Sequence, residues 1–111
     1  MSVEDVETVD AIGVDRQSGD VILTIADHLA WDDDHYHLTT LQEKLNTYIA
    51  FVESGELVRV YPDAKDRNVM IDVVAQHKYP PIAGQFFERV REIVESVPVR
   101  FRVRVLDTGV Q

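Results

Sequence analysis

The stretch "VRFRVRV", residues 99–105, places an apolar residue and an arginine in strict alternation. Successive side chains of a β-strand point to opposite faces of its sheet, so this period of two predicts a strand with one apolar and one basic face. We therefore expect a sheet that packs against helices on one side. The apolar face should carry Val99, Phe101, Val103 and Val105, and the other face Arg100, Arg102 and Arg104.

Two further segments have the helical period that such a layer requires. Gly55 can close the first helix in the left-handed conformation. The second helix should begin at Pro80 and Pro81 and end before Pro98. The apolar stripe of the first comprises Leu38, Leu41, Leu45, Tyr48, Ile49 and Val52, and that of the second comprises Ile82, Phe86, Val90, Ile93, Val94 and Val97.

The remaining apolar runs predict two β-hairpins. "VDAIGVD" (9–15) and "DVILTIAD" (20–27) flank a short glycine-containing loop, "RQSG". "ELVRVYP" (56–62) and "VMIDVVA" (69–75) flank a polar, turn-rich loop in the same way.

These elements give the order ββαββαβ. The predicted fold is an α+β two-layer sandwich, with a largely antiparallel five-stranded sheet and both helices on one face. We expect a frayed N-terminus over residues 1–8, a single domain over residues 9–106 and a C-terminal tail over residues 107–111.

Composition narrows the classes of function. The chain has 111 residues, no cysteine and a net charge of −9. Without cysteine there is no disulfide framework, thiolate zinc site or cysteine nucleophile. The excess negative charge lies entirely in residues 1–34, which argues against nucleic acid as a partner of that part. No signal peptide and no bilayer-length apolar run is present, so we predict a cytoplasmic protein without membrane contact.

The segment "DHLAWDDDHYHL", residues 27–38, is rich in potential ligands and admits a chemical interpretation. Asp27, His28 and His35 could hold a metal ion, and Asp27 with His28 could act as a general base. The spacing does not favour this, because His35 and His37 are two residues apart and lie on different sides of a helix. We accordingly predict no metal and no cofactor.

The same segment also admits a structural interpretation, which we favour. A helix that starts at Asp32 would use the carboxylate of Asp32, or of an adjacent aspartate, as the N-cap, with the following aspartates near the positive end of the helix dipole. Trp31 and Tyr36 have the spacing of a hydrophobic staple. This interpretation leaves Asp27 and His28 unexplained.

The strings D-H-L-x-W (27–31) and H-L-x-x-L-Q-x-K-L-N-x-Y-x-x-F-x-E-S-G-E (37–56) resemble a small family of uncharacterised bacterial proteins. The resemblance covers about residues 9–106. It implies a bacterial, stand-alone, cytoplasmic protein and brings no activity, cofactor or catalytic residue with it.

Two polar sets remain to be explained. Gln42, Asn46 and Glu53 share one side of the first helix and form either a solvated face or a polar groove beside Asp27 and His28. The arginine row forms either cross-strand pairs with carboxylates or an exposed basic stripe for a protein partner.

Two functions from different classes follow. We favour a non-enzymatic protein-interaction or self-assembly module, most simply a homodimer, that uses Arg100, Arg102 and Arg104 beside the apolar Ile22, Met70 and Val74. The alternative is a small enzyme or metal-binding protein centred on Asp27, His28 and His35. No nucleophile motif and no glycine-rich phosphate loop supports that alternative.

Overall fold

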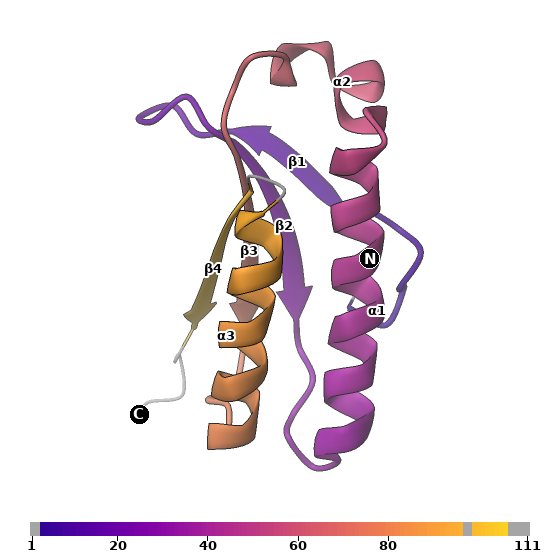
Figure 1. Ribbon diagram of the computed structural model, residues 1–111. Coiled ribbons are helices and arrows are strands. Elements are labelled where there is room, and N and C mark those ends of the chain that lie inside the picture. The colour runs from indigo at the N-terminus through magenta and orange to yellow at the C-terminus, as the bar shows by residue number, and fades with distance from the viewer. Residues whose placement is uncertain (1–2, 97–98, 107–111) are drawn as a thin grey trace.

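The computed structural model describes residues 3–96 and 99–106 (Figure 1). Within them the chain forms four strands, three α-helices and one 3₁₀ turn. In chain order these are β1 (Ala11–Val14), β2 (Val21–Asp27), α1 (Asp34–Glu53), α2 (Glu56–Val60), η1 (Pro62–Ala64), β3 (Val69–Ala75), α3 (Pro81–Glu95) and β4 (Arg100–Val105).

The sheet is four-stranded and mixed, in the order β1-β2-β3-β4. The predicted hairpin of β1 and β2 is present and antiparallel, but β2 pairs with β3, and β3 with β4, in parallel. The prediction of a five-stranded, largely antiparallel sheet in the order ββαββαβ was therefore wrong. The α+β class and the two-layer arrangement hold.

The error comes from residues 56–60, predicted as a strand and found as the helix α2. Gly55 closes α1 with φ of 83°, as expected, and the chain re-enters a helix at once. In "ELVRV" only Leu57 is buried. A single helical turn can bury that one side chain, so the segment does not need to pair with a strand of the sheet. Without this strand, α1 becomes the crossover between β2 and β3, which makes those strands parallel.

Both long helices lie on the same face of the sheet (Figure 1). The two crossover connections, β2-α1-β3 and β3-α3-β4, each lead to the next strand in the same direction across the sheet. Because such crossovers have the same handedness, they place both helices on the same face. The core forms between these layers. Its sheet contribution comes from Val21, Leu23, Ile25, Ile71, Val73, Val99 and Phe101.

The prediction that Asp32 or an adjacent aspartate caps the first helix is confirmed. The N-cap is Asp33, whose carboxylate Oδ1 accepts the backbone N–H of Tyr36 at 3.1 Å. The predicted staple does not form, because Tyr36 is about half exposed and Trp31 stacks on His37.

Helix α3 turns a different side to the sheet than its sequence predicted. Its buried residues are Ala83, Phe87, Val90 and Val94, whereas Ile82 and Ile93 are 50% and 58% exposed. The helix carries two overlapping apolar stripes about one residue apart, and periodicity alone does not choose between them. Val97, predicted in the stripe, lies outside the described residues.

The segment before β1, expected to be frayed over residues 1–8, contacts α1 from residue 3 onward. Val3 is fully buried, and the buried Nζ of Lys44 donates to the carbonyl oxygens of Asp5 (2.7 Å) and Thr8 (2.6 Å). Nζ also lies 2.8 Å from the carboxylate of Asp10, as a charge contact without hydrogen-bond geometry. One lysine thus neutralises a buried carboxylate and fixes the incoming chain.

Candidate functional site

The face of the sheet opposite the helices is the first candidate. Among residues 3–96 and 99–106, no helix or strand lies over it (Figure 1). The register sets Met70 beside Ile22 and Arg100, and Asp72 beside Thr24 and Arg102. The residues on this face are Ala11, Gly13, Ile22, Thr24, Ala26, Met70, Asp72, Val74, Arg100, Arg102 and Arg104.

Asp72 holds two arginines of this face. Its carboxylate accepts hydrogen bonds from Nε and Nη2 of Arg102 at 3.2 and 3.1 Å. It also accepts hydrogen bonds from Nε and Nη2 of Arg104 at 3.3 and 2.8 Å. The Asp72 side chain is 1% exposed, while those of Arg102 and Arg104 are 45% and 49% exposed. The aspartate is therefore covered by its own partners, and the guanidinium groups face outward.

The contacts of this cluster favour the ionised form of Asp72. Burial raises the pKa of Asp72, but hydrogen bonds and charge from Arg104 and Arg102 outweigh burial and leave that pKa below its ordinary value of 3.8. The same hydrogen bonds raise the pKa of Arg104. Arg100, the third member of the row, lies 3.7 Å from the carboxylate of Asp20. All three arginines thus have carboxylate partners within the chain, and two share Asp72 on β3.

A shallow basin of about 470 Å³ lies beside the arginines, over β1 and β2. Its walls include Arg102, Arg104, Asp15 and Ile22, and its β1 side has small residues, Ala11 and Gly13. A Cβ added at Gly13 would meet no atom within 4 Å, so this edge of the face is open.

The second candidate, Asp27, pairs with a residue that the sequence interpretation did not select. Nε2 of His37 lies 2.6 Å from Oδ2 of Asp27, and Nδ1 of His37 donates to the carbonyl of Ala30 at 3.2 Å. Both side chains of the pair are 1% exposed. Because Nδ1 must donate to a carbonyl, the Nε2 contact needs one further proton, shared between imidazole and carboxyl.

The surroundings of this pair complete its contacts. Oδ1 of Asp27 accepts the backbone N–H of Leu29 at 3.1 Å, and the ring of Trp31 stacks on His37 with 3.6 Å between centroids. Protein partners therefore occupy both ring nitrogens and both carboxylate oxygens. The pair fastens the end of β2 to the first turn of α1.

The other proposed ligands do not join Asp27. His28 lies 3.7 Å from Glu4, and His35 is exposed on α1. Within the described part of the chain, no three His, Asp or Glu side chains are grouped as a metal site would need. The sequence does contain a signal for the burial of His37. His37 precedes Leu41 by four residues and therefore lies on the buried stripe of α1.

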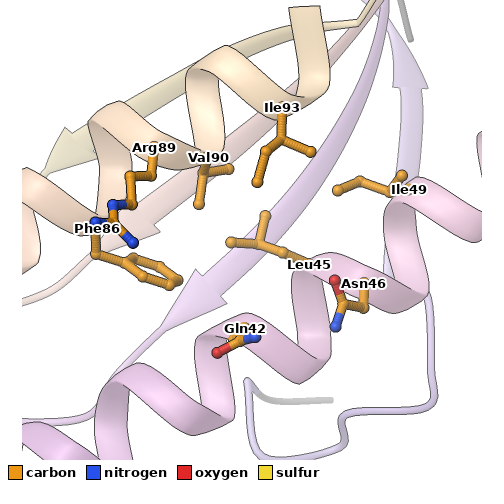
Figure 2. Close-up of a pocket in the computed structure, with 8 residues that line it drawn as sticks. All are labelled: Gln42, Leu45, Asn46, Ile49, Phe86, Arg89, Val90 and Ile93. Atoms are coloured by element: carbon orange, nitrogen blue, oxygen red, sulfur yellow. The ribbon is translucent and has the colours of Figure 1, made fainter. Parts of the chain in front are cut away.

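The polar side of α1 leads to a third candidate, a groove of about 230 Å³ between α1 and α3 (Figure 2). Gln42 and Asn46 line it, as a groove hypothesis requires, but Glu53 does not belong to its lining. The groove lies against α3 and not beside Asp27 and His28. Its remaining walls are Leu45, Ile49, Phe86, Arg89, Val90 and Ile93.

Comparison with protein families gives a match over residues 1–107 to the model described as "Family of unknown function (DUF6572)". The chain belongs to this family. The match confirms the predicted resemblance to a family of unknown function and extends over nearly the whole chain. No curated protein and no solved structure gives a significant match to this member of DUF6572. No helix among the described residues combines the length and apolar character needed to cross a bilayer.

Proposed function

We propose that the protein is a non-enzymatic interaction module of the bacterial cytoplasm, which forms a homodimer through the uncovered face of its sheet. One observation carries the proposal. Strands β2, β3 and β4 pair in parallel within the mixed sheet, which has helices on one face only. Sheets that are parallel throughout occur almost entirely in proteins that cover both faces, and we extend this expectation to the parallel part of this sheet.

The chemistry of the face suits a protein partner. Ile22, Met70 and Val74 lie half-buried between the small residues of β1 and the arginines of β4. Arginine and methionine are enriched in protein interfaces, and charged residues are depleted from interface cores. Because Asp72 already orients Arg102 and Arg104, docking would fix fewer free side-chain rotations.

A two-fold axis parallel to the strands satisfies both shape and charge. It sets β4 of one copy over β1 of the other, so the long arginines face Ala11 and Gly13 and approach the turn that carries Asp15. An axis perpendicular to the strands would set one arginine row over the other and bring like charges together. The first arrangement supports the proposal, and closed two-fold symmetry is the commonest one for homo-oligomers.

The size of the face sets the expected strength. Four strands spaced about 4.8 Å apart, with seven residues of about 3.3 Å in the longest, give a flat footprint of about 440 Å² per copy. Standard stable interfaces bury about 800 Å² per partner. The face is therefore smaller than a standard stable interface, and we expect a weak dimer whose population depends on protein concentration.

Sedimentation equilibrium at tens of micromolar tests the proposal. Ala26→Glu, at an exposed position of this face away from Asp72, should give a monomer, and Arg102→Glu should weaken the dimer. Arg59→Glu makes the same charge change on α2, where the side chain is 76% exposed, and should leave association intact. A wild-type monomer at low and physiological salt would remove the proposal, and a dimer that survives Ala26→Glu would move it to another surface.

The alternative of a catalytic or metal site at Asp27, His28 and His35 gains no support from the geometry. Asp27 and His37 are buried with all their polar atoms engaged, and His28 and His35 lie outside that pair. We propose a structural role for the Asp27–His37 pair.

A further inference from the structure

Helix α3 carries more apolar surface than the fold buries. Ile82, Phe86 and Ile93 lie at positions i, i+4 and i+11, on the side of α3 that neighbours the buried stripe. Ile82 and Ile93 are 50% and 58% exposed, and Phe86 is only partly buried. Eleven residues of helix span about 16 Å, or three turns, so the exposed stripe has the length of a short helix.

This stripe and α1 form the walls of the groove in Figure 2. Leu45 of α1 and Val90 of α3 face one another across its base, and Ile49 and Ile93 approach from the two sides. Its volume of about 230 Å³ is below the 300–1,000 Å³ typical of small-molecule pockets. A space of this size accepts an inserted side chain more readily than a cofactor.

The rim of the groove holds three polar side chains without a protein partner. Arg89 and the amides of Gln42 and Asn46 all line it, and within residues 3–96 and 99–106 none of the three side chains forms a hydrogen bond or ion pair. Arg89 stands between Phe86 and Ile93 along α3 and is the only charged residue of the lining. The groove therefore combines an apolar floor with an exposed arginine that forms no ion pair within the described residues.

We infer that the α1–α3 groove binds an acidic amphipathic helix of a partner protein. Such a helix would insert an apolar side chain between Leu45 and Val90, lay a second over Ile93, and place a carboxylate on Arg89. Helix-in-groove recognition uses anchors at i, i+3 or i+4 and i+7, which match three turns of exposed stripe.

This inference does not rest on the proposed dimer, because all residues of the groove come from α1 and α3 and the dimer face lies on the other side of the sheet. Both can hold together, in which case the dimer presents two outward grooves. Each can also fail alone, since the substitutions that test them lie in different layers.

The test selects binders from a displayed library of random helical peptides, about sixteen residues long, and repeats the selection against Arg89→Glu. We expect the wild type to enrich peptides with apolar residues at i, i+4 and i+7 and an acidic residue beside them. Binding of a selected peptide should weaken about tenfold in Arg89→Glu. The reselected pool against that variant should favour lysine or arginine at the same position.

Matched controls locate the site and guard against misfolding. Arg59→Glu should leave peptide affinity unchanged, and Ile93→Gln, at an exposed position, should weaken it with normal urea stability. Amide chemical shifts should move along α1 and α3 and not on β4. The inference is overturned if no such pattern is enriched, if selected peptides bind Arg89→Glu equally well, or if the shifts map to the open sheet face. Self-association lost in Arg89→Glu would assign the groove to a second copy.

Discussion

Replacing His37 with phenylalanine should be among the most damaging single changes in this protein. Phenylalanine keeps a flat ring against Trp31 but removes both nitrogens, so the carboxylate of Asp27 stays buried with only the N–H of Leu29 as partner. Removing one member of a buried charge pair costs about 3–5 kcal/mol. That is a large share of the 5–15 kcal/mol that typically stabilises a domain.

Urea unfolding measures this cost, with Trp31 as an internal probe, since it is the single tryptophan and stacks on the altered ring. With a slope of about 2 kcal/mol per molar, a loss of about 4 kcal/mol moves the midpoint down by about 2 M. The double variant Asp27→Asn/His37→Phe removes the stranded charge and should recover part of the loss. A His37→Phe midpoint within 0.5 M of wild type, or a double variant less stable than the single one, would refute a stabilising role for the Asp27–His37 pair.

Three further predictions concern stability. Asp33→Ala should cost about 0.5–2 kcal/mol in urea melts through loss of the α1 N-cap, whereas Asp32→Ala should change little. Burial raises the pKa of the Tyr48 phenol to about 12, so ultraviolet titration should show one tyrosine that ionises near pH 12. Because the folded pKa of Asp72 lies below its unfolded value near 3.8, its contribution is present above about pH 4 and lost as pH falls through the folded pKa. Asp72→Asn should therefore flatten the acid limb of a stability–pH curve, and an unchanged limb would contradict the ionised cluster.

The sequence predicts much of the fold where a residue pattern is compatible with only one secondary structure. Alternation over residues 99–105 assigns the arginines and valines of β4 to opposite faces, and Gly55 marks the end of α1. Patterns with two solutions mislead. "ELVRV" suits a strand or a single helical turn, and because it is helical, β2 and β3 are successive strands of the sheet and pair in parallel.

The sequence predicts those parts of the candidate sites that depend only on which face of a strand or helix a residue occupies. The alternation of residues along β4 predicts the open face of the sheet. The four-residue spacing of Gln42 and Asn46 predicts that both lie on one side of α1, where they line a groove. The partner of Asp27 does not, because the contact joins a strand end to a helix turn ten residues later. Asp72 also escaped notice, since a lone aspartate in an apolar strand has no pattern until the register places it beside Arg102.

The most direct measurement of the central claim is the distance between two copies across the open face. A mixture of isotope-labelled and unlabelled protein allows filtered NOE measurements that detect only contacts between copies and alter no residue of the face. Facing sheets pack about 10 Å apart, and a two-fold axis along the strands sets β2 of one copy over β3 of the other. The account predicts intermolecular NOEs between the methyl groups of Ile22 and Met70, and none from the exposed Ile93 on α3. No intermolecular NOE from the open face, or NOEs from Ile93 alone, would contradict it.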